Sequence, residues 1–535
     1  MNPYVSYYVN QAGSGIGPVF QGAAHQRGFG FFGNLFRAVF PLFKSGAKAI
    51  GTEALNAGFG LLRDKINQKD LKTSLKERMR DAGNNLMSKA EQKIDHMQGS
   101  GYKCCRKRKK QHFNAVSKRS KVPVTQLSVE EGSWVRIKPI AAISNDAPLE
   151  FHIPAQSEEY IDPSETQLLI KCKITKADGS ALSDSAKVAP INNFLHSMFS
   201  DCSIQLNQKQ ITSSSQLYPY RALLETLFSY NSDAKSTRLQ QQLWFPDDFG
   251  QMDSCTADNS GYIARQALAA KSKTLSMLGR LHSDIFQQGR LIPNGVSLDV
   301  KLTPAKPNFA LMSGDDEPDY RIKICDATLL VRKCKLSASV SLGHAAGAEI
   351  EPFKIPINRT EMRAITISQG LTTKEIPNHV IGQMPVRFAC FLISNSALNG
   401  RYDKNPLNAA DFTLNHISLN VNGRLVSPSP LAPDFDKGDY IECYNTTFSG
   451  TGLSNKNDGH CVNYSQYPNC ACAYFFDLTA DLSANEGHWS VRKSGTLNFE
   501  IKFKKALTEP VTCITYCEYQ NLIQIDKSRN VLTDY

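Results

Sequence analysis

The sequence lacks the short motifs that mark the common catalytic and nucleotide-binding sites. It contains no GxSxG, HExxH or GxxxxGK[ST] pattern, and its eleven histidines are scattered along the chain. Such patterns place a nucleophile, two zinc ligands or a phosphate-binding loop at a fixed spacing. Their absence removes the usual sequence evidence for a hydrolase, a zinc protease or a nucleotide-dependent enzyme. We therefore expect neither catalytic residues nor a cofactor.

The fourteen cysteines form no pattern typical of a zinc site or a disulfide framework. No CxxC pair is present, and a disulfide between the neighbours Cys104 and Cys105 would be strained. The best metal candidate is a set of four residues, His460, Cys461, Cys470 and Cys472. Zinc ligands usually come in pairs separated by two to four residues, and neither HC nor CxC fits that spacing. Buried thiols in a loop are the favoured interpretation, so no metal is expected.

Long apolar runs are also missing. No stretch approaches the ~18 apolar residues that a membrane-spanning helix needs. Residues 1–30 lack the basic start and the apolar core of a secretory signal. We expect synthesis in the cytosol, reduced thiols and no simple membrane-spanning helix. The acidic groups Asp247–Asp248 and Asp315–Asp316–Glu317 are interpreted as solvated loop charges.

Positive charge is concentrated in the first quarter of the chain. Lys and Arg exceed Asp and Glu by 15 over residues 1–121, and the whole chain carries +11, so the other 414 residues carry 11 − 15 = −4. A basic block of this kind usually binds nucleic acid or an anionic surface, whereas a nearly neutral body indicates neither partner.

The region before the basic block falls into two segments. Residues 1–30 are rich in Gly, Tyr and Gln and predict a flexible arm. Residues 31–98 predict an amphipathic and then a charged helical region, which Pro41 should kink or divide. The apolar residues at helical spacing are Phe32, Leu35, Phe36, Val39, Phe40 and Phe43. They favour one of two kinds of helix. One lies on a membrane surface, and the other docks into a groove of a partner or of this protein, for example on the inner face of a capsid.

The densest positive charge lies in residues 99–121, interpreted as a basic linker. Its two clusters have the spacing of a bipartite nuclear-localisation signal, and the same charges would neutralise phosphates without reading a base sequence. The candidate residues for nuclear import or nucleic-acid contact are Arg106, Lys107, Arg108, Lys109, Lys110, Lys118, Arg119 and Lys121. No RNA-recognition or zinc-finger pattern accompanies them, so binding should be non-specific and salt-sensitive. A solvated linker is the alternative.

From about Val122 the pattern changes to short runs rich in β-branched residues, separated by turn residues. Six runs predict strands: Gln167–Thr175, Val296–Leu302, Tyr320–Arg332, Arg387–Ser394, Thr496–Phe503 and Val511–Glu518. Ile191–Phe199 and Tyr220–Tyr230 are the helical exceptions. Many short strands with few helices are typical of sandwich and barrel folds.

A faint internal repeat runs through this part. Ser203–Ile211 and Ser418–Val426 both predict hairpins, at an offset of 418 − 203 = 215, and Asn422–Gly423 is a strong type I′ turn signal. Tyr220–Phe228 aligns with Tyr440–Phe448 at an offset of 440 − 220 = 220. A similar order at a similar spacing predicts two tandem domains of one fold, each of roughly 200 residues.

The body of the chain resembles the double jelly-roll major capsid proteins of Maverick/Polinton-type elements and adintoviruses, from about Val122 to Asp534. Four stretches carry the resemblance: YPYRALLETLFSY (Tyr218–Tyr230), ATLLVRKCKLSASVSLGHA (Ala327–Ala345), IGQMPVRFACFLISNSALNGRYDKNPLN (Ile381–Asn408) and ALTEPVTCITYCEYQNLIQIDKSRNV (Ala506–Val531). It implies a mainly β fold of two tandem eight-stranded jelly rolls, placed at residues 122–340 and 341–535. It also implies a trimer of pseudo-hexagonal outline that tiles an icosahedral shell, without an active site.

The first hundred residues resemble another product of the same elements, a small adenovirus core-protein-like polypeptide. YYVNQAGSGIGPVFQG and QRGFGFFGNLFRAVFPLFKSGAKAIGTEAL carry this resemblance. That polypeptide is usually encoded separately, so the fused arrangement departs from the family pattern.

The resemblance also implies a processing site. These elements commonly encode adenovirus-type cysteine proteases, which cut (Met/Ile/Leu)-x-Gly-x before Gly. MQGSG matches that pattern at Met97, Gly99, Ser100 and Gly101, with the cut between Ser100 and Gly101. A flexible linker that matches by chance is the alternative.

The leading prediction is therefore a structural capsid protein whose N-terminal extension serves genome contact, nuclear import or membrane interaction. The alternative is a nucleic-acid-condensing or membrane-active accessory virion protein. The expected partners are two further copies in a homotrimer, a penton-like minor capsid protein, a DNA genome bound through phosphates, and a membrane during entry. The expected locations are the virion and, during assembly, the host nucleus. A jelly-roll sugar-binding protein is disfavoured because no ligand cluster is recognisable.

Overall fold

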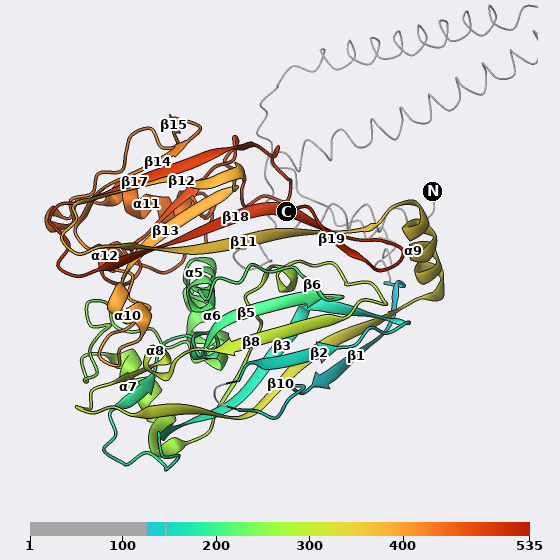
Figure 1. Ribbon diagram of the computed structural model, residues 1–535, viewed down its shortest axis with the longest axis horizontal. Helices are drawn as coiled ribbons and strands as arrows, with labels where there is room; N and C mark the ends of the chain where they lie inside the picture. Colours follow the sequence, from blue (N-terminus) through green and yellow to red (C-terminus); the bar gives the residue numbers. More distant parts are fainter. Residues whose placement is uncertain (1–125, 145–146) are drawn as a thin grey trace, which may run out of the picture. The chain divides into compact units, whose positions relative to one another are not determined.

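The computed structural model describes residues 126–144 and 147–535, which belong to one compact unit (Figure 1). The predicted flexible arm, helical region and basic linker lie outside the described residues. Within the described residues, no helix combines the length and the apolar composition needed to cross a bilayer.

The first half of the described chain, here called the first roll, contains two four-stranded antiparallel sheets. Sheet A has the order β1-β10-β3-β7 and sheet B the order β2-β8-β5-β6. The strands are β1 Val129–Ile137, β2 Leu149–Ile153, β3 Glu159–Lys176, β5 Phe199–Leu206, β6 Lys209–Gln210, β7 Leu275–Gly279, β8 Leu298–Pro304 and β10 Tyr320–Leu336. A small extra sheet pairs β4 (Val188–Pro190) with β9 (Leu311–Ser313).

The second half, the second roll, repeats this arrangement. Sheet D has the order β11-β18-β13-β16, with β19 added to β18, and sheet E has the order β12-β17-β14-β15. The strands are β11 Phe353–Ile367, β12 Thr373–Gln383, β13 Arg387–Ser394, β14 Leu414–Val421, β15 Arg424–Leu425, β16 Ala473–Asp477, β17 Ser494–Phe503, β18 Val511–Ile525 and β19 Val531–Thr533. Helix α9 (Ala338–Ile350) connects the two rolls and contains residue 340, the domain boundary predicted from the sequence.

The strand order confirms the predicted double jelly roll. When the eight main strands of each roll are counted in chain order, sheets A and D both read 1-8-3-6, and sheets B and E both read 2-7-4-5. This is the double-sheet arrangement of an eight-stranded jelly roll. All six predicted strand segments fall on β3, β8, β10, β13, β17 and β18, and β13 has the predicted bounds of Arg387–Ser394.

The hairpin turns of both rolls carry the expected backbone geometry. Asn422 and Gly423 have φ of 52° and 76°, and Asn207 and Gln208 in the first roll have φ of 44° and 66°. A type I′ turn requires positive φ at both central residues, and it matches the twist of the flanking strands. Each hairpin is followed by a helix, α5 (Tyr218–Ser229) or α11 (Ile441–Ser449), so the repeat seen in the sequence is a repeat of structure.

One helix prediction is wrong in its extent. Ile191–Phe199 was expected to be helical, but α4 covers only Phe194–Ser197, and β5 begins at Phe199. Contacts at both ends limit the helix: the Ile191 amide donates to the Ala310 carbonyl, and Phe199 pairs with Pro304 of β8, so only Phe194–Ser197 between them is helical. The second prediction, Tyr220–Tyr230, is confirmed as α5.

The remaining helical segments are short and lie in the connections between strands. They are α6 Ser232–Ser236, η1 Arg238–Gln242, α7 Ser260–Ala269, η2 Ala270–Ser272, η3 Asp284–Phe286, α8 Pro307–Ala310, α10 Asn395–Asn399, η4 Phe435–Lys437 and α12 Tyr467–Cys470. Buried apolar residues of both rolls form one connected core cluster. The two rolls are therefore packed against each other through apolar contacts.

Candidate functional site

The predicted functional residues of the N-terminal region lie outside the described residues. This holds for the basic residues from Arg106 to Lys121, for the apolar set from Phe32 to Phe43, and for the processing residues Met97, Gly99, Ser100 and Gly101. These assignments remain predictions.

The four residues first considered for a metal have other partners. His460 Nε2 lies 2.9 Å from Thr447 Oγ1, and its Nδ1 accepts a hydrogen bond from the Val462 amide at 3.2 Å. Burial, helped by the charge of Lys235, lowers the pKa of His460 to about 3, so the ring is neutral. Cys461 is exposed, whereas Cys472 is buried with its Sγ 3.3 Å from the Tyr474 hydroxyl. In the part of the chain that the structure describes, no three His, Cys, Asp or Glu residues are placed to hold a metal ion.

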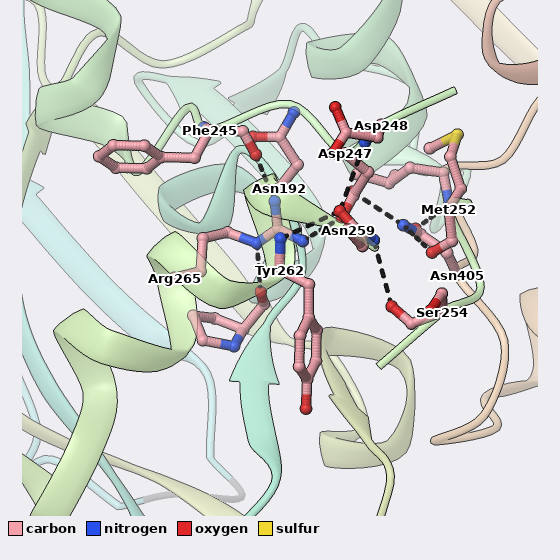
Figure 2. Close-up of polar contacts among 12 residues, drawn as sticks. Asn192, Phe245, Asp247, Asp248, Met252, Ser254, Asn259, Tyr262, Arg265 and Asn405 are labelled. Atoms are coloured by element: carbon pink, nitrogen blue, oxygen red, sulfur yellow. Dashed lines mark hydrogen bonds and ion pairs between the residues drawn. The ribbon is translucent and has the colours of Figure 1, made fainter. Parts of the chain in front are cut away.

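The interpretation of Asp247 as a solvated loop charge is wrong. Its side chain and that of Arg265 on α7 are fully buried and form an ion pair of 2.5 Å (Figure 2). Arg265 Nε also donates to the Pro190 carbonyl at 2.7 Å, and its Nη1 donates to the Phe245 carbonyl. The pairing partner lies 18 residues away, which is why the local sequence could not reveal it.

Asp247 also joins the two rolls. Its Oδ1 accepts from Asn259 Nδ2 at 2.9 Å, and its Oδ2 accepts from Asn405 Nδ2 of the second roll at 3.0 Å. The backbone N–H of Asn405 donates to Asp253 Oδ1 at 2.7 Å, and Figure 2 shows Asn405 beside this loop. A buried carboxylate with these partners has its lone pairs satisfied, so the loop and Asn405 are held in one geometry.

A second polar cluster surrounds α5. Arg221 Nε lies 2.7 Å from Glu225 Oε1, and Arg221 Nη2 lies 2.6 Å from Asp284 Oδ1. The Thr360 amide of β11 donates to the same Asp284 oxygen at 3.2 Å, and His282 Nδ1 lies 2.6 Å from Glu225 Oε2. All five residues are less than a tenth exposed. The cluster therefore links two segments of the first roll, α5 and the residues after β7, to β11, an edge strand of the second roll.

The two carboxyls of this cluster are shifted in opposite directions. Burial acts to raise the pKa of Glu225, but Arg221 and the hydrogen bond with His282 outweigh burial and leave that pKa below its ordinary value. For Asp284 burial prevails over the attraction of Arg221, and its pKa is raised. The guanidinium of Arg221 thus outweighs the effect of burial on the pKa of Glu225 but not on the pKa of Asp284.

The outer face of sheet D carries a third buried pair, Arg387 with Glu518, and both side chains have no exposed surface. Arg387 Nε donates to the Gly450 carbonyl at 2.7 Å, and Asn358 Nδ2 donates to Glu518 Oε1 at 2.7 Å. Burial raises the pKa of Glu518 despite Arg387. Apolar contacts complete the joint: the rings of Tyr220 and Phe391 have centroids 5.9 Å apart, and those of Phe228 and Phe475 have centroids 4.7 Å apart.

The end of the chain fastens the second roll to the first. Tyr535 donates its hydroxyl to the Ile211 carbonyl at 2.7 Å, and Asn207 Nδ2 donates to the Arg529 carbonyl at 2.7 Å. Arg529 Nη2 also donates to Asn294 Oδ1 at 2.7 Å. The hydrogen bonds, ion pairs and ring contacts described above suit a rigid mechanical joint between two domains.

The chain resembles known proteins in sequence and in fold, although no family model matches the sequence. The uncharacterized protein F54H12.2 of Caenorhabditis elegans is 22% identical over 426 residues, which cover 77% of this chain and 99% of that protein. In the 3.5 Å cryo-EM structure of the Sputnik virophage, one chain aligns with a TM-score of 0.53 and 11% identity, covering 80% of this chain and 93% of the other.

The chain has the fold of a viral double jelly-roll protein. A second aligned structure is the crystal structure of PBCV-1 VP54 fitted into a cryo-EM reconstruction of the virophage Sputnik. It has a TM-score of 0.50 and 10% identity, and the alignment covers 78% of this chain and 99% of that chain. The structural neighbours are double jelly-roll major capsid proteins of viruses. At such low identity the shared feature is the fold.

The junction residues were not identified from the sequence, although one signal was present. Arg387 opens the apolar run RFACFLIS, and Glu518 interrupts VTCITYCEYQN. Arg221 and Glu225 stand four residues apart in the apolar segment YRALLETLF. Charged residues in runs buried on all sides are rare unless they are paired, so these positions indicated buried ion pairs. Their partners could not be inferred, because each pair except Arg221–Glu225 joins segments that are distant in sequence.

Proposed function

We propose that this protein is the major structural subunit of an icosahedral viral shell of the Maverick/Polinton type, and that it assembles as a homotrimer. One observation carries the proposal: two jelly rolls of identical strand order are joined in one chain by a buried junction. Proteins of virus particles share this fold, and the sequence resemblance to Polinton capsid proteins covers the same residues. A shell subunit needs rigid domains and extensive contact surfaces, and no catalytic group is required.

We propose further roles for the N-terminal region, all of which rest on its sequence. The basic residues Arg106–Lys110, with Lys118, Arg119 and Lys121, contact the phosphates of a DNA genome and support entry into the host nucleus. Phe32–Phe43 binds a membrane or the inner face of the shell. Cleavage between Ser100 and Gly101 separates this segment from the capsid subunit and leaves the basic run as its new N-terminus. A penton-like protein would close the vertices of the shell.

The size and shape of the purified full-length chain test the shell proposal. We expect a mass of three chains by light scattering at micromolar concentration, and rings or shells in negative-stain micrographs. A stable monomer without particles would contradict the shell and favour the accessory-protein alternative.

The N-terminal roles have their own tests. If about five phosphates are contacted by Arg106–Lys110, the logarithm of the affinity for duplex DNA should fall with the logarithm of salt at a slope near −4.5. Replacing these five residues by alanine should flatten the slope. Incubation with the element's protease should yield a chain that starts at Gly101, and Gly99→Val should block the cut.

A further inference from the structure

Helix α9, which connects the two rolls, is unusually exposed for its length. Only Val340 of its thirteen residues is buried, compared with eleven of twelve in α5 and three of nine in α11. Figure 1 shows α9 at one end of the described unit, before the start of β11. Its sequence, ASVSLGHAAGAEI, contains one acidic residue and neither Lys nor Arg. A solvated helix normally carries charged and polar side chains on its outer side, so the composition of α9 calls for an explanation.

One side of α9 packs against the two rolls. Val340 belongs to a small apolar cluster with Tyr160 and Leu336, which is separate from the main core. His344 Nδ1 lies 3.0 Å from the Tyr160 hydroxyl oxygen, and the centroid of its ring lies 5.8 Å from that of Phe353. These contacts fix the inward side of the helix. Nothing comparable covers the opposite side within the described residues.

The opposite side carries an apolar stripe, called here the outward face. Leu342, Ala346 and Ile350 follow one another at a spacing of four residues, so they lie on one face of the helix. The side chains of Leu342 and Ile350 are 72% and 89% exposed. Gly343 and Gly347 lie beside the stripe, and no atom of another described segment lies within 4 Å of the position that a Cβ would take at either residue. The outward face is therefore apolar and has room for large side chains.

The energetics of α9 also favour a partner on this face. Glycine in a helix interior is destabilising relative to alanine, and α9 contains two such residues. Short helices in water owe most of their stability to the packing of an apolar face. Among the described residues, α9 obtains such packing only on its inward side, where a single residue is buried. A second packing surface on the outward face would account for both the apolar stripe and the persistence of the helix.

The described chain begins beside this helix. The Ser337 amide, immediately before α9, donates to the Ser128 carbonyl at 2.9 Å, and Val129 pairs with Leu336. The 125 residues that precede Gln126 are therefore tethered to the subunit next to α9. A tether raises the local concentration of every segment that it carries, and so favours binding to a nearby surface.

The sequence of this extension contains a segment of matching chemistry. The six apolar residues of Phe32–Phe43 have helical spacing, and four of them are phenylalanine. Large side chains on one helix pack well against small residues on another, because they fill the space that the small residues leave. The charges agree as well, since Lys and Arg exceed Asp and Glu by 15 over residues 1–121, while Glu130 and Glu131 are exposed where the chain reaches α9. Opposite charges favour association and help to orient it.

We propose that the outward face of α9 binds the segment Phe32–Phe43 of the N-terminal extension. The inference deepens the role proposed above for this segment and rests on it, because it names the surface of the subunit to which the segment binds. Residues 44–125 then form a loop with both ends held at α9. The basic residues from Arg106 to Lys121 lie within that loop, so the docking concentrates positive charge at this end of the subunit.

Hydrogen–deuterium exchange of the full-length protein, measured by mass spectrometry for residues 338–350, tests the docking. The double variant Phe36→Ser, Phe40→Ser removes two central aromatic side chains of the segment. Exchange in α9 should become roughly tenfold faster or more, because the helix loses its outer cover. The matched control is Tyr7→Ser, Tyr8→Ser, which removes two aromatic side chains from the same extension outside the segment. Exchange in α9 of this control should equal that of the wild type.

A reciprocal variant separates docking from local damage. Leu342→Glu, Ile350→Glu places charge on the outward face and leaves the inward contacts of α9 intact. Exchange in residues 31–43 should become faster by a similar factor, because the coupling between two binding surfaces is reciprocal. The control is Ile263→Glu, Leu268→Glu, at exposed positions of α7, and it should leave residues 31–43 as in the wild type. Circular dichroism confirms that each variant is folded.

The possible outcomes distinguish the occupants of the outward face. Unchanged exchange in α9 after the loss of both phenylalanines would overturn the docking. Protection of α9 that disappears on dilution, and does not depend on the segment, would overturn it in favour of a contact between two copies of α9. Protection of residues 31–43 that appears only with anionic phospholipid vesicles would overturn the docking and support the membrane role of the segment. Protection neither by α9 nor by vesicles would overturn the proposed role of the segment itself.

Discussion

Sheet A of the first roll and sheet D of the second have the same strand order, yet their outer faces differ in what surrounds them. β3 of sheet A alternates between buried and partly exposed residues, whereas β13 of sheet D is buried along nearly its whole length. The difference arises because α5 and the residues after β7 pack on sheet D and place ion pairs and aromatic rings there. One topology thus serves as an enclosed layer in one roll and as an open surface in the other.

The difference also explains where charge is tolerated. Sheet A carries most of its cations on a solvated face, where each costs little, and Lys333 of β10 is the buried exception. Sheet D carries Arg387 and Glu518 without exposed surface, and each requires the other together with neutral hydrogen-bond partners. The enclosed sheet should therefore be sensitive to single substitutions to which the open sheet is indifferent.

The largest expected effect comes from removing one partner of the enclosed ion pair. Arg387→Ala leaves the carboxylate of Glu518 buried without its cation, which should lower the free energy of unfolding by roughly 3–5 kcal/mol. Lys171→Ala, on the outer face of sheet A, should change it by less than about 0.5 kcal/mol. Urea unfolding, at a concentration low enough to keep the chains monomeric, measures both. Equal losses would show that sheet A is as enclosed as sheet D.

The two equivalent helices provide the next comparison. Phe228 of α5 is fully buried against Phe475 and His460, so Phe228→Ala should cost roughly 3–4 kcal/mol of unfolding free energy. Phe448 of α11 is only partly buried and stacks on His460, so Phe448→Ala should cost about half as much. Thermal and urea unfolding of both variants measure which of them loses more stability. A larger loss at Phe448 would contradict the view that α11 lies open in the single chain.

Acidification should act on the covered side of the molecule through His460. The folded-state pKa of His460 is about 3, below the 6.5 of an ordinary imidazole, because the ring is buried beside Phe228 and near Lys235. Its contribution to stability is complete above pH 6.5 and is lost as the pH falls from 6.5 toward 3, because the unfolded chain takes up the proton first. Between pH 7 and pH 5 the loss should be about 2 kcal/mol.

A variant of His460 isolates this effect. His460→Gln should flatten the dependence of the unfolding free energy on pH between 7 and 5, whatever it does to stability at pH 7. Unfolding curves at four pH values suffice. An unchanged slope in His460→Gln would show that the ring is not the group that titrates.

The smallest expected effect concerns the equivalent hairpin turns. Gly423 in the second roll has φ of 76°, which glycine adopts readily, whereas Gln208 in the first roll has φ of 66°. Gln208→Gly should therefore raise the free energy of unfolding by up to about 1 kcal/mol, and Gly423→Ala should lower it by about 1 kcal/mol. Differential scanning calorimetry compares the two. A lower free energy of unfolding in Gln208→Gly, or a higher one in Gly423→Ala, would contradict the shared turn geometry.

Much of the fold could be predicted from local sequence alone. Alternating runs such as Gln167–Thr175, the Asn422–Gly423 turn, and the repeated order of hairpin and helix depend on side-chain periodicity and backbone preference, which neighbouring residues determine. The apolar run Arg387–Ser394 was also predicted as a strand, and β13 has the same bounds. Ile191–Phe199 was predicted too long a helix because its two ends contact residues that are distant in sequence, Ala310 and Pro304.

The sequence by itself determined that this is a chain of two similar β domains preceded by a basic extension, since composition, periodicity and repeat are properties of neighbouring residues. Only the tertiary structure decided that Asp247 is buried with Arg265 and Asn405, that Arg387 meets Glu518, and that one of two equivalent sheets is enclosed. The polar contacts of Asp247 and Arg387 alone join residues up to 158 positions apart. Burial and pairing at that range are properties of the packed domains, so no local pattern contains them.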